Sequence, residues 1–146
     1  MDCGPSCLRM IAKYYGKSFS LQTLRERSYI TRQGVSFLGI SDAAESLGFR
    51  SIGVLLSLKQ LLSEAPKPLI IHWKQNHFIV VYKTRRKKVF VADPALGKIT
   101  YTVDEFAKNW LSTKEDGESK GLAMLLEPTP EFYAHEGEKV NRAGFR

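Results

Sequence analysis

Three side chains of this sequence have the types and the chain order of a nucleophile, a base and an orienting carboxylate, and a cysteine is the first of them. Cys3 is followed by Gly4 and Pro5, and proline suits the first helical turn, so Cys3 is predicted at or just before a helix N-terminus. The unpaired N–H groups and the dipole of such a terminus favour an anion and therefore stabilise the nucleophilic thiolate. The alternative is a near-terminal thiol with no chemical role.

The two possible partners of this thiol lie at the ends of predicted strands. His77 follows the predicted hairpin connection 74–76, and a strand end can present an imidazole to a cleft, as a general base requires. Asp93 ends the predicted strand 89–92 and precedes Pro94, which holds it extended. A carboxylate there can accept the Nδ1–H of a neighbouring imidazole and stabilise the imidazolium. The alternative is an ordinary Asp-Pro turn.

The remaining cysteine and histidines are interpreted as structural or exposed. Cys7 is predicted to be a small apolar core residue, His72 a buried or paired histidine, and His135 a solvent-exposed residue of the C-terminal segment. The Cys-x₃-Cys and His-x₄-His spacings keep a structural zinc site open as an alternative. The long separation of the two pairs in sequence argues against zinc, and we expect neither a metal nor a cofactor in this domain.

Hydrophobic periodicity predicts helices in the first half of the chain and strands in the second. Helical spacing or capping signals mark the segments 5–15, 20–24, 36–47, 57–62 and 102–110. Runs of β-branched and aromatic residues mark strands at 68–73, 77–82, 89–92, 98–101 and 121–126. Helices followed by an antiparallel sheet indicate an α+β fold.

Length and composition indicate one globular domain. The chain has 146 residues, of which 43% are hydrophobic and 25% charged, so a disordered or collagen-like chain is excluded. No apolar run approaches the ~18 residues of a membrane span, and no signal peptide is recognisable. Two cysteines are too few for a disulfide framework, so we expect a soluble domain in a reducing compartment.

The net charge of +7 favours an acidic partner or surface without naming one. The basic run 83–88 lies between two predicted strands and is interpreted as a solvated hairpin tip. Because no aromatic stacking platform accompanies it, nucleic acid is not an expected partner. A minor contact with an anionic surface or an acidic segment is the alternative.

A cysteine on a helix N-terminus with a histidine and an aspartate on adjacent strands is the arrangement of papain-like cysteine peptidases. Six sequence blocks also closely resemble the bacteriocin-processing cysteine peptidase domain of peptidase-containing ABC transporters. These blocks are Asp2–Leu8, Tyr14–Gly16, Gly34–Ser36, Ala43–Phe49, His72–Phe78 and Ala92–Gly97. The resemblance covers residues 2–127 and implies a papain-like fold.

The resemblance also implies an activity and its catalytic residues. Members of this family cleave leader peptides after a double-glycine motif, and the attached transporter exports the cargo. Carried over by position, Cys3 is the nucleophile, His77 the general base and acid, and Asp93 the orienting carboxylate. The family places a glutamine before the nucleophile as an oxyanion-hole donor, whereas only Met1 and Asp2 precede Cys3 here. This departure implies either a truncated N-terminal edge or another oxyanion donor.

The expected organisation is a peptidase domain over residues 1–127 and a linker over 128–146 that leads to a transmembrane domain. The resemblance implies ATP as the cofactor of a nucleotide-binding domain elsewhere, and a full-length homodimer at the cytoplasmic side of a bacterial inner membrane. The expected partners are the double-glycine leader and the transmembrane and ATPase domains. Besides zinc, the open alternative is a docking module that binds leaders without cutting them.

Overall fold

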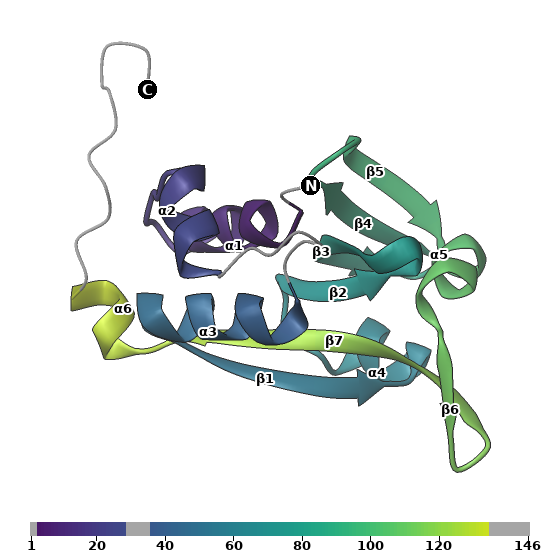
Figure 1. Cartoon of the computed structure of the whole chain (residues 1–146). Helices are drawn as coiled ribbons and strands as arrows, with labels where there is room; N and C mark the ends of the chain where they lie inside the picture. The colour runs from purple at the N-terminus through teal and green to yellow at the C-terminus, as the bar shows by residue number, and fades with distance from the viewer. Residues whose placement is uncertain (1–2, 29–35, 135–146) are drawn as a thin grey trace.

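The computed structural model describes residues 3–28 and 36–134, and Figure 1 shows their helices arranged around a curved sheet. The helices are α1 (Cys3–Tyr14), α2 (Leu21–Arg27), α3 (Phe37–Leu47), α4 (Leu58–Ser63), η1 (Lys74–Asn76, a 3₁₀ turn), α5 (Val103–Trp110) and α6 (Pro130–Ala134). The strands are β1 (Phe49–Leu56), β2 (Leu69–Trp73), β3 (His77–Arg85), β4 (Lys88–Asp93), β5 (Gly97–Thr102), β6 (Thr113–Glu115) and β7 (Glu118–Pro128). The predicted α+β class is confirmed.

The helices begin where hydroxyl side chains cap them, as the sequence predicts. The Oγ of Ser36 accepts the N–H of Gly39 at 3.0 Å at the start of α3. Capping boxes begin α4 at Ser57 and α5 at Thr102, so in both the N-cap and the N3 residue satisfy each other's backbone N–H. Gly48 ends α3 with φ +102°, a left-handed conformation that glycine adopts without steric cost.

The sheet is antiparallel at every pair and has the strand order β1-β7-β2-β3-β4-β5, with β6 paired to β7 alone. Short connections join β2, β3, β4 and β5 in chain order. β7 comes from the end of the domain, yet it lies between β1 and β2. The predicted strands of the second half are therefore all present, and the β2–β3 connection is the short turn η1.

The sequence analysis missed β1, which lies in the half of the chain predicted to be helical. β1 carries no clean alternation of buried and exposed residues, because it forms the edge of the sheet and packs partly under α3. A Cβ at Gly53 would overlap the ring of Phe37, so the small residue admits this helix side chain. The partner strand β7 is distant in sequence, which leaves no local signal of the pairing.

Two hydrophobic cores lie on the two faces of the sheet. The first is formed by α1, α2, α3 and α6 against residues of β2, β3 and β7, and Figure 1 shows α1 and α3 over this face. The second contains Trp73, Phe106 and Trp110 and is covered by α4 and α5. Alternate residues of β2 serve the two cores: Ile70 belongs to the first and Ile71 to the second. Helices therefore pack on both faces of β2 and β3.

The packed domain extends beyond residue 127, where the sequence analysis places the start of a linker. Residues 130–134 form α6, and Phe132 is fully buried with its ring 4.5 Å from that of Phe49. The N–H of Thr129 donates to the carbonyl of Gly48 at 3.0 Å. The linker interpretation is therefore wrong for 130–134, because the single aromatic Phe132 anchors a segment that shows no periodicity. Residues 135–146 lie outside the described part of the chain.

The basic run 83–88 forms the end of the β3–β4 hairpin, and its side chains from Arg85 to Lys88 are exposed. The predicted hairpin tip is confirmed.

Within residues 3–28 and 36–134, no helix has the length and hydropathy to cross a membrane.

Candidate active site

Cys3 is the first residue of α1, and its side chain is 8% exposed. The first turn of α1 contains no acidic residue that would oppose a negative charge there. The first N–H groups of a helix have no intrahelical acceptor, so they can donate to an anion bound at this end of α1. The predicted place of Cys3 at a helix N-terminus is confirmed, and its catalytic role stays a prediction.

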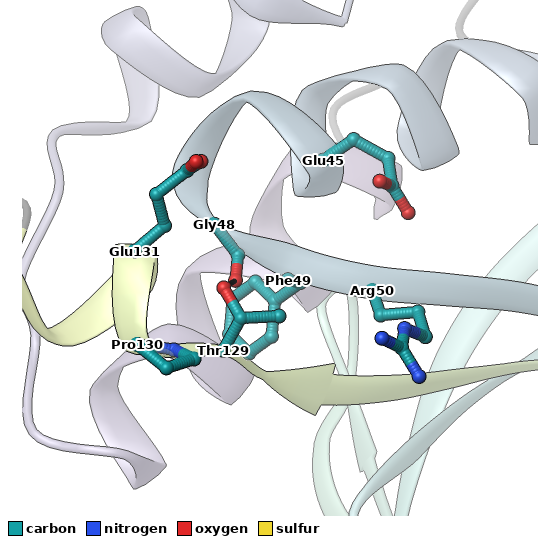
Figure 2. Close-up of a pocket in the computed structure, with 7 residues that line it drawn as sticks. All are labelled: Glu45, Gly48, Phe49, Arg50, Thr129, Pro130 and Glu131. Atoms are coloured by element: carbon teal, nitrogen blue, oxygen red, sulfur yellow. Dashed lines mark hydrogen bonds between the residues drawn. The ribbon is translucent and has the colours of Figure 1, made fainter.

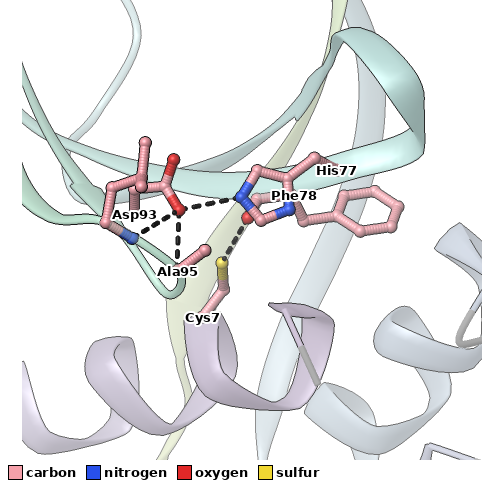
Figure 3. A network of polar contacts seen from close by, with 6 residues as sticks. Cys7, His77, Phe78, Asp93 and Ala95 are labelled. Atoms are coloured by element: carbon pink, nitrogen blue, oxygen red, sulfur yellow. Dashed lines mark hydrogen bonds and ion pairs between the residues drawn. The ribbon is translucent and has the colours of Figure 1, made fainter. Parts of the chain in front are cut away.

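His77 and Asp93 are in direct contact at the start of β3 and the end of β4. The Nε2 of His77 lies 2.8 Å from Oδ1 of Asp93, and the two side chains are 16% and 3% exposed (Figure 3). The sequence analysis expects the carboxylate at Nδ1, and this detail is wrong. The hairpin directs the other ring nitrogen to Asp93, and Nδ1 has no hydrogen-bond partner among the described residues. Nδ1 is therefore the nitrogen available for proton transfer.

The position of Asp93 is fixed by the turn that follows it. Its Oδ1 also accepts the backbone N–H of Ala95 at 2.8 Å and that of Leu96 at 3.3 Å. The N–H of Leu96 lies 3.2 Å from the Asp93 carbonyl as well, which closes the turn. The two interpretations of Asp93, an Asp-Pro turn and a partner for histidine, are thus both correct. The same oxygen atom serves the turn and the imidazole.

Cys7 lies one turn after Cys3 on α1 and is fully buried. Its Sγ donates a hydrogen bond to the backbone carbonyl of Phe78 at 3.3 Å, which joins α1 to the residue after His77 (Figure 3). Burial raises the pKa of the Cys7 thiol well above its ordinary value, and electrostatic interactions with Cys3 and Asp93 raise it further. Cys7 is therefore held as a neutral thiol.

The three predicted residues lie at one end of the sheet, but only two of them are in contact. His77 and Asp93 touch, whereas no hydrogen bond joins Cys3 to either of them within the described residues. Cys3 shares the first core with Phe78, and it acts electrostatically on Cys7 together with Asp93. The N-terminal turn of α1 thus lies over the strand ends that carry the imidazole and the carboxylate.

The other candidate side chains lie apart from this contact. The ring centroid of His72 lies 5.2 Å from that of Phe78, in a structural packing role. Trp73 packs against Tyr101 and Phe106 in the second core, with centroid distances of 5.3 Å to each. His135 lies outside the described residues, as do Met1 and Asp2, so the expectation about an upstream oxyanion donor falls outside them too.

The contacts of the site do not match the zinc alternative. Cys7 uses its thiol hydrogen on a carbonyl, and His77 uses Nε2 on a carboxylate. Within the part of the chain that the structure describes, no group of three or more His, Cys, Asp or Glu side chains is placed to hold a metal ion.

A separate open pocket of about 440 Å³ lies where α3 meets β1 and where β7 meets α6 (Figure 2). It is lined by Glu45, Gly48, Phe49, Arg50, Thr129, Pro130 and Glu131. A Cβ at Gly48 would overlap the backbone nitrogen of Phe132, so the glycine permits α6 to approach this closely. Neither Cys3, His77 nor Asp93 lines the pocket, which belongs to the docking of α6.

Sequence reasoning missed the backbone groups that hold the site together. The N–H groups of Ala95 and Leu96 orient Asp93, and the carbonyl of Phe78 binds Cys7. The Asp-Pro dipeptide is a signal for the first of these, because aspartate commonly accepts the N–H two residues on in a turn. The second has no local signal, since the two partners lie in different halves of the domain.

Comparison with known sequences gives one family and several similar proteins. The sequence model of the peptidase C39 family matches residues 1–114. The lactococcin-G-processing and transport ATP-binding protein LagD of Lactococcus lactis subsp. lactis is 40% identical over 136 residues, which are 90% of this chain and 18% of LagD. The transport/processing ATP-binding protein ComA of Streptococcus pneumoniae is 29% identical over 99% of this chain and 20% of its own length. The chain thus spans about a fifth of these relatives.

Solved structures similar to this chain have the same fold. A double glycine motif protease from an AMS/PCAT transporter, solved in complex with the leader peptide, has a TM-score of 0.76 at 30% identity, over 87% of this chain and 84% of that one. The peptidase domain of Streptococcus ComA has a TM-score of 0.74 at 30% identity, over 88% of this chain and 92% of that one. The predicted papain-like fold is confirmed.

Proposed function

Because this chain belongs to the peptidase C39 family, a family of cysteine peptidases, we propose that it cuts leader peptides after a double-glycine motif. Cys3 is the nucleophile, His77 the general base and acid, and Asp93 the residue that orients the imidazole. The observation that carries these roles is the 2.8 Å contact between His77 Nε2 and Asp93 Oδ1, which leaves Nδ1 for the thiol. The solved relative bound to a leader peptide supports the choice of substrate.

The first half of the reaction forms an acyl-enzyme. Nδ1 of His77 takes the Sγ proton of Cys3, and the thiolate attacks the carbonyl carbon of the second glycine. The backbone N–H of Cys3 is among the first of α1, has no intrahelical acceptor, and is available to the oxyanion. The C–N bond then breaks, and His77 gives its proton to the leaving amine of the cargo.

The second half releases the leader. His77 takes a proton from water, and the resulting hydroxide attacks the thioester carbon. The C–S bond breaks, the leader leaves with a new carboxyl group, and the Cys3 thiolate is restored. Asp93 accepts a hydrogen bond from Nε2 and stabilises the imidazolium in both halves. Glycine at the cut site suits a narrow slot that admits no Cβ.

The longer relatives support a proposal about the whole protein. The peptidase domain joins transmembrane and ATP-binding domains that export the processed peptide, and ATP serves those domains rather than the peptidase. The peptidase faces the bacterial cytoplasm at the inner membrane, and the full protein is a homodimer. The cargo is a bacteriocin, a pheromone or another secreted peptide.

The test offers this domain a synthetic leader peptide with a double-glycine motif and analyses the products by mass spectrometry. We expect one cut, directly after the second glycine, that Cys3→Ala abolishes. Cys3→Ala should still bind the peptide, which separates a peptidase from a docking module. Cutting at other positions, or cutting by Cys3→Ala, would refute the proposal.

A further inference from the structure

No step of the proposed mechanism uses Cys7, although this buried thiol lies beside the site. Its Sγ is 3.3 Å from the carbonyl of Phe78, the residue that follows His77 in β3. Cys7 is fully buried, so the thiol has no water to bond instead. A buried carbonyl that loses its donor costs free energy, so this bond constrains how α1 lies on β3.

The carbonyl of Phe78 cannot receive a donor from the turn that follows β4. The ladder between β3 and β4 begins at the pair Val80–Ala92. The same register continued toward the start of β3 places Pro94 opposite Phe78, and proline has no N–H. The proline that holds Asp93 therefore offers this carbonyl no backbone donor, and the Cys7 thiol supplies one.

We propose that Cys7 is a positioning residue whose S–H···O bond to Phe78 fixes the N-terminal turn of α1, and with it Cys3, against His77. This inference rests on the proposed function, in which Cys3 and His77 exchange a proton. Cys3 and Cys7 are one turn apart on the same face of α1, so an anchor at Cys7 sets the place of Cys3. The anchor works only while the thiol keeps its hydrogen.

The surroundings of Cys7 keep that hydrogen in place. Burial is the largest cause that raises its pKa, and electrostatic interactions with Cys3 and Asp93 raise it further. A thiolate formed at Cys3 therefore strengthens the preference of Cys7 for the neutral, donating form. The two thiols therefore have different environments and roles. Cys3 at the helix end is the proposed nucleophile, and Cys7 one turn inside α1 is a hydrogen-bond donor.

The test replaces the donor and measures the reactivity of Cys3 directly. Cys7→Ser keeps a donor, Cys7→Ala removes it, and Cys7→Val fills the space without one. The matched control is Ile11→Val, which removes one methyl group from the same buried face of α1. For each variant we measure the second-order rate of Cys3 alkylation by iodoacetamide from pH 5 to 9, kcat and KM on the double-glycine peptide, and the thermal midpoint.

We expect Cys7→Ala and Cys7→Val to lower kcat and the alkylation rate about tenfold, the rate equivalent of one lost hydrogen bond, with KM unchanged. Cys7→Ser and Ile11→Val should stay within about threefold of the wild type. Wild-type rates in Cys7→Ala or Cys7→Val, equal losses in Cys7→Ser, or equal losses in Ile11→Val would each overturn the proposal. If Cys7→Ala does not fold, Cys7→Val against Cys7→Ser decides it.

Failure of this inference is distinguishable from failure of the proposed function. Alkylation of Cys3 needs no substrate, so it reports on the thiol even if the double-glycine peptide is not cut. A wild type that cuts the peptide while Cys7→Val remains fully active would leave the peptidase proposal standing and remove the role of Cys7.

Discussion

One oxygen of Asp93 binds both the imidazole of His77, at 2.8 Å, and the turn that follows β4. The orientation of the histidine ring therefore depends on the backbone of residues 93–96. Bonds from the backbone N–H groups of Ala95 and Leu96 hold this oxygen in place and leave Nδ1 of His77 without a bond to Asp93. The contact between His77 and Asp93 therefore depends on a hairpin turn rather than on a long-range network.

The first prediction compares the two histidines of neighbouring strands. His77→Ala should lower kcat/KM by about 10²–10⁴, because it removes the proposed general base and acid. His72→Ala is the matched control, since His72 packs on Phe78 without a carboxylate partner in the described residues. Steady-state cleavage of the double-glycine peptide measures both. Comparable losses in the two variants would contradict the assignment of His77.

The second prediction separates the two tasks of Asp93. Asp93→Asn keeps an oxygen acceptor for His77 and for the turn, so kcat should fall only about tenfold, as a neutral bond replaces a charge-assisted one. Asp93→Ala leaves the N–H groups of Ala95 and Leu96 without an acceptor and should also cost about 1–3 kcal/mol of stability. Peptide cleavage and urea unfolding measure the two effects. An Asp93→Ala variant as stable as Asp93→Asn would rule out the structural task.

The third prediction tests whether α6 belongs to the folded domain. Phe132→Ala should lower the free energy of unfolding by about 3–5 kcal/mol, because Phe132 is fully buried between Tyr15 and Phe49. Tyr133→Ala is the control, since its side chain is 54% exposed, and it should cost less than about 1 kcal/mol. Chemical denaturation measures both. Similar, small costs would mean that the domain ends before α6.

The fourth prediction follows from the raised pKa of the buried Cys7 thiol. Above pH 9 the unfolded chain releases the Cys7 proton while the folded domain keeps it, so the unfolded state binds fewer protons and stability falls as pH rises. At pH values below the ordinary pKa of a thiol, Cys7 does not change how the free energy of unfolding depends on pH. The free energy of unfolding should therefore decline more steeply between about pH 8 and pH 10 in the wild type than in Cys7→Ser, whose hydroxyl does not titrate there.

Urea titrations of both proteins at each pH measure this difference. Burial lowers the pKa of Lys67 and raises the pKa values of Tyr15 and Tyr101. Both proteins contain these groups, so their contributions cancel in the comparison. Parallel pH profiles would show that Cys7 is not held in its neutral form by the fold.

The sequence predicted the elements whose signals are local. Ser36 and Thr102 cap helices through bonds to residues three positions on, and the strands around His77 and Asp93 follow from β-branched and aromatic runs. The types and chain order of Cys3, His77 and Asp93 also suggested the catalytic roles that are proposed above. These features were readable because each depends on neighbours in the chain or on the intrinsic reactivity of a side chain.

Only the tertiary structure decided which distant groups meet. The pairing of β1 with β7, the burial of Phe132 against Phe49, and the bond from Cys7 to the Phe78 carbonyl all join segments far apart in sequence. The choice of Nε2 over Nδ1 at His77 likewise follows from where the packed hairpins direct the ring. Periodicity states which face of an element is apolar, but the partner on that face is chosen by the packing of the whole sheet against its helices.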